Sequence, residues 1–213
     1  MLKELFQLPN LVSLSRIALT PLVGYFLAQD SMQGTIICCV LLVIAAITDG
    51  LDGYLARKMN KISQLGIALD PIADKIFAGV LVLLLIFYRD FPLWLAGVII
   101  GRDLLILLAG SLLLRGRKIV VPSNITGKYA FGMIAFLLAS YVVRFEFGIW
   151  LTTWLTLIFI VASLVNYTRV FIRVKNNKPA PVLRDKPVYK IIRFGLSLIA
   201  LAVFFYRFYI DLF

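Results

Sequence analysis

The sequence contains no histidine, so carboxylates, lysine or tyrosine must carry any acid–base chemistry. It has only two cysteines, Cys38 and Cys39, which are adjacent in an apolar run; this argues against a disulfide framework or a cysteine metal site and favours small buried side chains. Charged residues make up only 15% of the 213 residues, whereas 62% are hydrophobic. A soluble domain is about 25% charged and about 45–50% apolar. We therefore expect the lipid bilayer to be the main solvent of this chain.

Basic residues outnumber acidic ones, 22 to 11, which gives a formal net charge of +11. In a membrane protein, lysine and arginine gather in cytoplasmic loops and meet anionic headgroups, so we expect no nucleic-acid partner. The N-terminal MLKELFQLPN lacks the pattern of a cleavable signal peptide.

The hydrophobic residues are grouped in seven runs, and a helix that spans the bilayer needs about 20 such residues. We predict an all-α integral membrane protein, with a membrane domain at 1–175, a polar cytoplasmic connection at 176–190 and an extra hydrophobic helix at 191–213. That last helix is expected to span the bilayer, with an interfacial helix as the alternative. The runs are Leu11–Leu27, Gly34–Ala56, Ile67–Tyr88, Leu93–Leu114, Thr126–Val143, Ile149–Ile172 and Ile191–Ile210.

The turns after the second, fourth and sixth runs carry most of the basic residues, and the alternate turns carry few. Because cytoplasmic loops are enriched in lysine and arginine, this bias places the N-terminus inside the cell. The stretch 48–75, TDGLDGYLARKMNKISQLGIALDPIADK, then lies at the cytoplasmic edge of the cell membrane.

That stretch holds two pairs of aspartates within an otherwise apolar chain. Asp49 and Asp52 are three residues apart, and Asp70 and Asp74 are four apart, so each pair shares one helix face. A short connection turns the chain back and lets the pairs face each other. Four carboxylates in a small volume need cations, and hard divalent ions such as Mg²⁺ or Mn²⁺ suit oxygen ligands. Two such ions would suit phosphoryl chemistry.

Three further residues of the stretch favour a bound ligand. Gly53 and Gly66 stand where a missing side chain lets a ligand approach, and Arg57 can clamp two phosphate oxygens. The alternative is a structural network in which the acids pair with neighbouring basic residues, namely Arg57, Lys58, Lys61 and Lys75.

The stretch reads D-x-x-D-G-x-x-A-R-x8-G-x3-D-x3-D, from Asp49 to Asp74. It resembles the signature of the CDP-alcohol phosphotransferases at every fixed position, and the opening PNLVSLSRIALTPL is similar to the family's N-terminal motif at Asn10, Ser13 and Arg16. The resemblance implies a bundle of six transmembrane helices, assembled as a homodimer, with a polar cavity open to the cytoplasm.

The resemblance also implies roles for individual residues. Asp49, Asp52, Asp70 and Asp74 would bind two divalent metal ions, and Asp74 would also be the general base. CDP-diacylglycerol would be the lipid donor, and CMP would leave. Its nucleotide would be held by Asn10, Ser13, Gly53, Ala56, Arg57, Ser63 and Gly66.

The acceptor alcohol is less defined. An arginine inside a hydrophobic run is costly, so Arg102 is either an acceptor contact or half of a buried ion pair with Asp103 or another acid. Lys118, Lys128 and Arg173 are further acceptor candidates; the cluster that contains Lys118 has a headgroup anchor as its alternative. In its general features, the sequence resembles the phosphatidylglycerophosphate synthases, which take glycerol 3-phosphate, and the cardiolipin synthases of the same family. The former commonly show Gly-Lys-x-Lys-Thr where this sequence has Gly127-Lys128-Tyr129-Ala130-Phe131.

The leading hypothesis is an enzyme that transfers a phosphatidyl group from CDP-diacylglycerol to glycerol 3-phosphate. Phosphatidylglycerol, inositol phosphate and serine are alternative acceptors. A cation transporter and a silent lipid-binding scaffold are the other classes. The acids lie at one membrane edge rather than at the midplane, which argues against a transporter.

Overall fold

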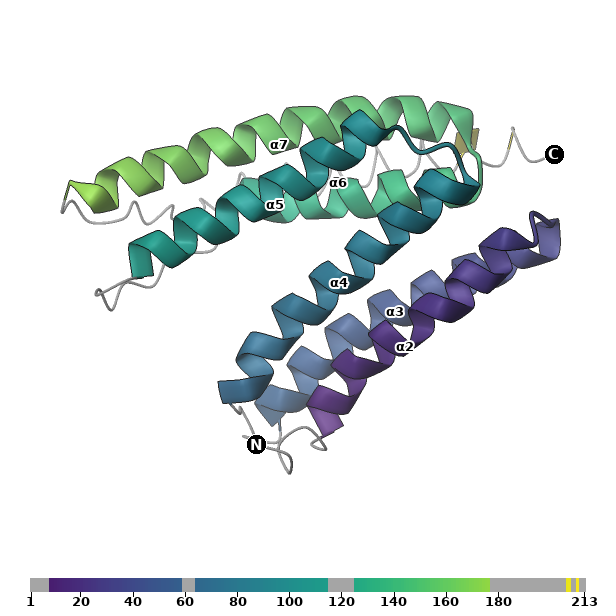
Figure 1. Ribbon diagram of the computed structural model, residues 1–213, viewed down its shortest axis with the longest axis horizontal. Helices are drawn as coiled ribbons and strands as arrows, with labels where there is room; N and C mark the ends of the chain where they lie inside the picture. Colours follow the sequence, from purple (N-terminus) through teal and green to yellow (C-terminus); the bar gives the residue numbers. More distant parts are fainter. Residues whose placement is uncertain (1–7, 59–63, 115–124, 177–205, 208–209, 211–213) are drawn as a thin grey trace. The chain divides into compact units, whose positions relative to one another are not determined.

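The computed structural model describes residues 8–58, 64–114, 125–176, 206–207 and 210 (Figure 1). Side chains are described from Ser15 to Thr48, from Lys75 to Leu108, from Thr126 to Arg173 and at 176, 206, 207 and 210. The described chain forms six long helices and contains no strand, which confirms the all-α prediction for this part. The helices are α2 (Leu8–Ala28), α3 (Met32–Lys58), α4 (Gln64–Tyr88), α5 (Leu93–Leu114), α6 (Ile125–Val142) and α7 (Glu146–Lys175).

These six helices coincide with the first six hydrophobic runs to within about three residues at each end, and α5 has the predicted bounds. The seventh run lies outside the described residues except for its last turns, where Tyr206, Arg207 and Ile210 are helical. Nearly all of the polar connection at 176–190 is likewise outside the described part of the chain.

Three tight turns join the helices in pairs: α2 to α3, α4 to α5 and α6 to α7. Each turn contains one residue in the left-handed region, Asp30 (φ 45°), Asp90 (φ 53°) or Arg144 (φ 54°). A short polar side chain such as aspartate tolerates this conformation better than most residues do. In each turn, the left-handed residue ends the preceding helix and lets the chain turn into the next one.

The chain divides into two compact units, which are described separately here. The first contains Met1–Ala96 and Tyr141–Val143, and the second contains Gly97–Ser140 and Arg144–Phe213.

In the first unit, α2 packs against both α3 and α4 (Figure 1). A Cβ atom at Gly24 of α2 would lie 3.0 Å from Cδ2 of Leu84, so this glycine lets α2 and α4 approach closely. The thiol of Cys38 in α3 lies 3.5 Å from the carbonyl oxygen of Val23 in α2. Lipid supplies no hydrophobic driving force between helices, so their association depends on van der Waals packing, and small residues let the backbones come close enough for it.

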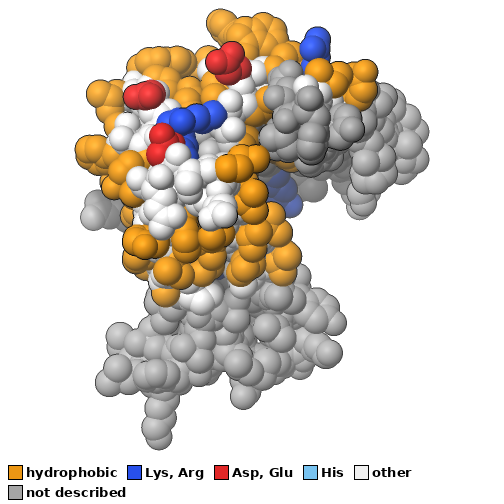
Figure 2. Space-filling model, turned by 90° about the vertical axis from the view of Figure 1, so that its right-hand side faces the viewer, with side chains coloured by type: hydrophobic (Ala, Val, Ile, Leu, Met, Phe, Trp, Pro, Cys, Tyr) orange, Lys and Arg blue, Asp and Glu red, His pale blue; other side chains and the backbone are white. Residues whose placement is uncertain are grey.

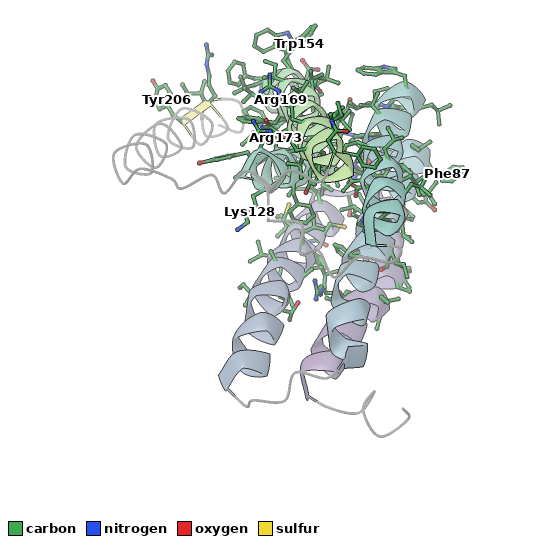
Figure 3. The ribbon with its side chains drawn as sticks, turned by 90° about the vertical axis from the view of Figure 1, so that its left-hand side faces the viewer. Phe87, Lys128, Trp154, Arg169, Arg173 and Tyr206 are labelled. Carbon is green, nitrogen blue, oxygen red and sulfur yellow. The ribbon has the colours of Figure 1, made fainter. Side chains whose placement is uncertain are left out.

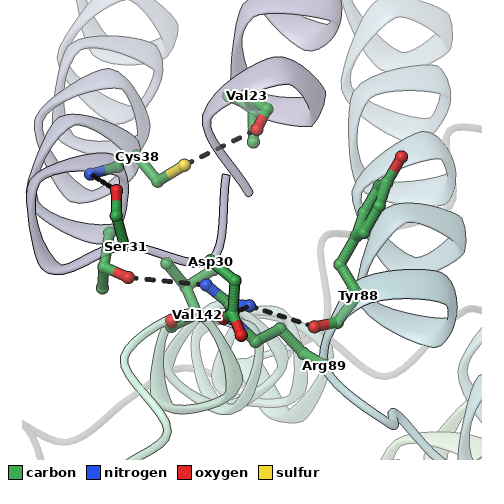
Figure 4. A network of polar contacts seen from close by, with 9 residues as sticks. Val23, Asp30, Ser31, Cys38, Tyr88, Arg89 and Val142 are labelled. Atoms are coloured by element: carbon green, nitrogen blue, oxygen red, sulfur yellow. Dashed lines mark hydrogen bonds and ion pairs between the residues drawn. The ribbon is translucent and has the colours of Figure 1, made fainter. Parts of the chain in front are cut away.

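Arg89, at the end of α4, is the polar centre of the same unit, and only 2% of its side chain is exposed (Figure 4). Its Nη1 donates to Oδ1 of Asp30 at 2.7 Å and to the carbonyl oxygen of Tyr88 at 3.0 Å. Its Nε donates to the carbonyl oxygen of Val142 at 3.3 Å, and Nη2 lies 3.4 Å from Oγ1 of Thr35. The guanidinium therefore ties the end of α4 to the α2–α3 turn and to the last residues of α6.

In the second unit, polar and aromatic contacts join α5, α6 and α7. Thr126 of α6 accepts a hydrogen bond from Asn166 of α7 at 3.2 Å, and Tyr129 stacks on Phe159 with ring centroids 5.5 Å apart. At the start of α7, a Cβ on Gly148 would collide with the ring of Phe145. Only glycine fits at that position.

Large hydrophobic side chains are widely exposed on the described helices, as expected for a protein in lipid (Figure 2). On α3 they include Ile36, Val40, Val43 and Ile47. Within the stretches whose side chains are described, one helix, Glu146–Arg173, is long and apolar enough to cross a membrane, with a mean hydropathy of 2.0. Four others are apolar over shorter lengths: Ser15–Ala28, Met32–Thr48, Lys75–Tyr88 and Thr126–Val142.

Candidate active site

The aspartate motif occupies the end of α3 and the beginning of α4. Asp52 lies six residues before Lys58, the last residue of α3, and Asp70 lies six residues after Gln64, the first residue of α4. At 1.5 Å per residue, both are about 9 Å from the end of their helix. Asp49 and Asp74 lie nine and ten residues from those same ends, so about 14–15 Å away.

The two pairs therefore occupy matching heights on neighbouring antiparallel helices. Both helices pack on α2, and at the far end Arg89 links the end of α4 to Thr35 in the first turn of α3. This backbone arrangement meets a precondition for a shared site, because positions at one height can face each other across the helix pair. The side chains of the four aspartates lie outside the described part of the structure.

The donor set itself fits divalent cations. Four carboxylates on two helices offer only oxygen ligands, which Mg²⁺ and Mn²⁺ prefer. Among the side chains that are described, no three histidine, cysteine or acidic groups come together. In the sequence, the motif brings four such donors together within 26 residues, Asp49 to Asp74.

The other predicted residues of the nucleotide site are placed by backbone only. Asn10 and Ser13 lie in the first two turns of α2, Gly53, Ala56 and Arg57 in the last turns of α3, and Gly66 in the first turn of α4. Their side chains are outside the described set. Ser63 and Lys118 lie outside the described residues altogether.

Arg102, halfway along α5, is the best-defined of the predicted acceptor residues. It is 9% exposed, and its Nη1 forms an ion pair with Oδ1 of Asp103 at 2.6 Å. Its Nη2 donates to the buried hydroxyl of Ser163 in α7 at 3.1 Å, while Nε has no hydrogen-bond partner. The ion pair with Asp103 is therefore present, and it leaves part of the guanidinium unused.

Gly127, in the first turn of α6, lies beside this guanidinium. A Cβ atom there would be 3.5 Å from Nη2 of Arg102 and 3.5 Å from the hydroxyl oxygen of Tyr167. The glycine thus lies within van der Waals distance of two polar groups, one from α5 and one from α7. The cluster joins α5, α6 and α7 within one compact unit.

Lys128 and Arg173 are exposed, in contrast to Arg102 (Figure 3). Lys128 follows Gly127 on α6, and Arg173 lies near the end of α7, one turn beyond Arg169. Of the predicted acceptor residues whose side chains are described, Arg102 is buried, and Lys128 and Arg173 are exposed.

Three polar residues of α7 were not singled out from the sequence: Ser163, which contacts Arg102, Asn166, which contacts Thr126, and Tyr167, which lies near Gly127. They recur at spacings of three and four, which places them on one face of α7. Polar residues with helical spacing in an apolar run were the signal that would have found them. Arg89 was also missed, because it was counted only as a basic residue in a sparsely charged turn.

The family model for CDP-alcohol phosphatidyltransferase matches residues 6–165, which is most of the chain and includes the whole aspartate motif. The chain belongs to the CDP-alcohol phosphatidyltransferase family. Family membership accounts for the motif on α3 and α4 and for the apolar surface of the helices.

Relatives in this phosphatidyltransferase family carry two kinds of name. The chain is 37% identical over 124 residues to a CDP-diacylglycerol–glycerol-3-phosphate 3-phosphatidyltransferase of Aquifex aeolicus, covering 57% of this chain and 67% of that protein. A Bacillus subtilis protein of the same name is 33% identical over 136 residues, 58% of this chain and 70% of its own length. The human cardiolipin synthase (CMP-forming) is 36% identical over 119 residues, 55% of this chain but only 38% of that protein.

Proposed function

We propose that this chain transfers the phosphatidyl group of CDP-diacylglycerol to glycerol 3-phosphate, which gives phosphatidylglycerophosphate and releases CMP. The observation that carries the proposal is the complete aspartate motif at matching heights on α3 and α4. The names of the two bacterial relatives, which align over about two thirds of their own length, support glycerol 3-phosphate as the acceptor.

In the proposed reaction, the acceptor hydroxyl attacks the β-phosphorus of the CDP-lipid. A new P–O bond forms to the acceptor, the bond from the β-phosphorus to the bridging oxygen breaks, and CMP leaves with that oxygen. Asp74 takes the hydroxyl proton, provided that it lies within hydrogen-bond reach. Arg57 clamps a phosphate oxygen pair, and Asn10 and Ser13 hold the nucleotide.

Asp49, Asp52, Asp70 and Asp74 would hold two divalent cations, Mg²⁺ or Mn²⁺. When bound, such ions neutralise the diphosphate and the charge that develops on the leaving oxygen. The carboxylates have the further task of balancing the cations, so that the site keeps little net charge in the absence of substrate.

Phosphatidylglycerol is the second candidate acceptor, which would make the chain a cardiolipin synthase. The identity of 36% to the human protein of that name favours it, and so does the absence of the second lysine and the threonine after Gly127-Lys128. Glycerol 3-phosphate remains the first choice because the matches to the bacterial enzymes cover a larger share of those proteins.

The proposal includes a location and an assembly. The chain would lie in the cytoplasmic membrane as a multi-pass protein, with its N-terminus and active site on the cytoplasmic side and a second copy as its partner. The exposed apolar side chains of α3 and the apolar length of α7 support contact with lipid. The basic residues after α3, α5 and α7 support the orientation.

An acceptor panel tests the proposal. Purified full-length protein in detergent is given CDP-diacylglycerol, Mg²⁺ and one alcohol at a time, and CMP is measured. We expect glycerol 3-phosphate to accelerate release, chelation of Mg²⁺ to stop it, and Asp70→Asn to abolish it while the melting temperature is unchanged. Release with phosphatidylglycerol alone would reassign the acceptor. Turnover by Asp70→Asn at the wild-type rate would refute the metal site, and no release with any acceptor would favour a transporter or a scaffold.

A further inference from the structure

Arg16 places a buried charge in the first half of α2, where only 3% of the residue is exposed. It shares one face of the helix with Thr20, Val23 and Leu27, which are all buried and follow it at spacings of four, seven and eleven. A guanidinium on the buried face of an apolar helix costs free energy unless an anion compensates it. The position of Arg16 therefore calls for a carboxylate within its reach.

The contact of α2 with α3 shows which residue of α3 is level with Arg16. The thiol of Cys38 meets the carbonyl oxygen of Val23, and α3 runs antiparallel to α2 (Figure 1). Val23 lies seven residues after Arg16, and seven residues after Cys38 is Ala45, which is also buried. Asp49 is four residues further on, which is about 6 Å along the helix axis.

The contact of α2 with α4, which runs in the same direction as α2, gives a second comparison. A Cβ on Gly24 would lie 3.0 Å from Cδ2 of Leu84, so these two residues are level. Arg16 lies eight residues before Gly24, and eight residues before Leu84 is Ile76. Asp74 is only two residues nearer to the start of α4, which is about 3 Å along the axis. Among the four aspartates, Asp74 is thus the closest in register to Arg16.

The positions of Asp74 and Asp49 also continue the buried faces of their helices. Asp74 lies seven residues before Leu81, and Asp49 lies four residues after Ala45; both apolar residues are buried. Residues at these spacings share one face of a helix. In a helix, a long side chain lies over the turn N-terminal to its own Cα, and for Arg16 that direction leads toward the level of the two aspartates.

The helices of the first unit offer Arg16 few other anions. The sequence of α2 contains no acidic residue, and those of α3 and α4 contain only the four aspartates of the motif. Asp30, in the turn after α2, is fourteen residues from Arg16, which is about 21 Å along the helix axis, and it pairs with Arg89.

We infer that Arg16 is a positioning residue of the aspartate motif, with the carboxylate of Asp74 as its ion-pair partner. The guanidinium supplies one fixed positive charge to a group of four carboxylates and so reduces their mutual repulsion before any divalent ion binds. It also holds Asp74 in one orientation, as hydrogen-bonded neighbours do for other carboxylates that bind metals. The ion pair itself does not depend on the reaction, whereas its effect on turnover rests on the proposed function.

A double-mutant cycle in the presence of a chelator tests the ion pair. Arg16→Met leaves a buried carboxylate without its counter-charge, so the melting temperature of the full-length protein in detergent should fall by about 10 °C. Asp74→Asn removes the charge of that carboxylate. The double variant should therefore melt about 5 °C or more above the value obtained by adding the two single losses.

Asp30→Asn is the matched control, because it is the same chemical change in the same unit but beyond the other end of α2. Its loss should simply add to that of Arg16→Met, since distant residues do not couple. Additive losses for Arg16→Met and Asp74→Asn would overturn the inference, and so would equal coupling to Asp30→Asn. If Arg16→Met alone does not fold, a double variant with Asp74→Asn that folds supports the ion pair, and one that also fails overturns it.

The response to Mg²⁺ is a second measurement of the charge. A divalent cation replaces the positive charge that Arg16→Met removes, so Mg²⁺ should raise the melting temperature of this variant more than that of the wild type. In Arg89→Met, which removes a buried arginine from the far end of the same unit, the rise should equal the wild-type rise. An equal, non-zero rise in Arg16→Met and the wild type would overturn the inference.

Turnover tests the positioning role. Arg16→Met should lower kcat for CMP release about tenfold or more, while the KM for the acceptor stays within about twofold. Arg16→Lys keeps the charge and should recover part of the loss. A wild-type kcat in Arg16→Met would overturn the positioning role. If the cycle shows coupling, but Mg²⁺ shifts no variant and the wild type releases no CMP, the ion pair stands and the proposed metal-dependent reaction fails.

Discussion

Replacing Arg89 by methionine should be among the most damaging single changes to the stability of the first unit. The substitution keeps an apolar side chain of similar reach but removes every donor of the guanidinium. Four acceptors then lose a partner: Oδ1 of Asp30, Oγ1 of Thr35, and the carbonyl oxygens of Tyr88 and Val142. These acceptors lie on three separate segments: the α2–α3 turn with the start of α3, the end of α4 and the end of α6. The substitution therefore removes the contacts that hold these segments together.

The size of the effect follows from the exposure of each partner. The side chain of Asp30 is 56% exposed, so water can solvate it and its ion pair with Arg89 contributes only about 1 kcal/mol. The bonds to the carbonyl oxygens of Tyr88 and Val142 involve a buried charged donor, and such bonds contribute about 1.5–3 kcal/mol each. We expect a total loss of about 4–7 kcal/mol, which is the sum of these contributions. Asp30→Asn, which keeps an acceptor oxygen, should cost about 1 kcal/mol.

Thermal unfolding with a thiol-reactive dye measures the difference, because Cys38 is buried in the first unit and becomes reactive when that unit opens. In a chain of this size 1 kcal/mol corresponds to about 2–4 °C. Arg89→Met should therefore lower the melting temperature by about 10–20 °C, and Asp30→Asn by about 3 °C. Equal shifts for the two variants would mean that the exposed ion pair, and not the buried carbonyl contacts, supplies the stability, and the reasoning would fail.

Substitutions at Gly34 and Asp90 should affect stability through the backbone, and Gly79 serves as a control. A Cβ at Gly34 would lie 2.6 Å from the carbonyl oxygen of Phe26, so Gly34→Ala should lower the melting temperature; Gly79→Ala, with nothing within 4 Å, should leave it equal or slightly higher. Asp90 has a φ of 53°, so Asp90→Gly should preserve or raise the melting temperature. Asp90→Val should lower the free energy of unfolding by about 1–2 kcal/mol, and the melting temperature with it. Equal melting temperatures for Gly34→Ala and Gly79→Ala would show that the close approach at Gly34 does not constrain the residue there. A wild-type melting temperature for Asp90→Val would show the same for the left-handed conformation at Asp90.

The positions of the helices could be predicted from hydrophobic runs alone, because each run is broken by polar or turn-forming residues. The run Leu93–Leu114 became α5 with the predicted bounds, helped by Pro92 immediately before it. The division into two compact units could not be predicted, since it depends on which helix faces meet. Large hydrophobic side chains occur among both the buried and the exposed residues of the described helices, so hydropathy does not tell the two faces apart.

Part of the candidate site followed from the sequence and part did not. Regular spacing placed the two aspartate pairs at matching heights, because helix geometry converts residue numbers directly into distances. For Arg102 the sequence left two roles open, and the structure shows the ion pair with Asp103 together with a contact to Ser163. The helical spacing of Ser163 and Tyr167 marks a polar face of α7, but it does not reveal that Ser163 pairs with Arg102, 61 positions earlier in the chain.

The pairing of Asp103 with Arg102 has an electrical consequence for the middle of α5. The carboxylate cancels the charge of the buried guanidinium, so the pair as a whole is neutral. Either residue without the other would leave an uncompensated charge halfway along an apolar helix, which costs far more free energy than the neutral pair does. The two side chains therefore act as one unit, and a change to one of them is also a change to the environment of the other.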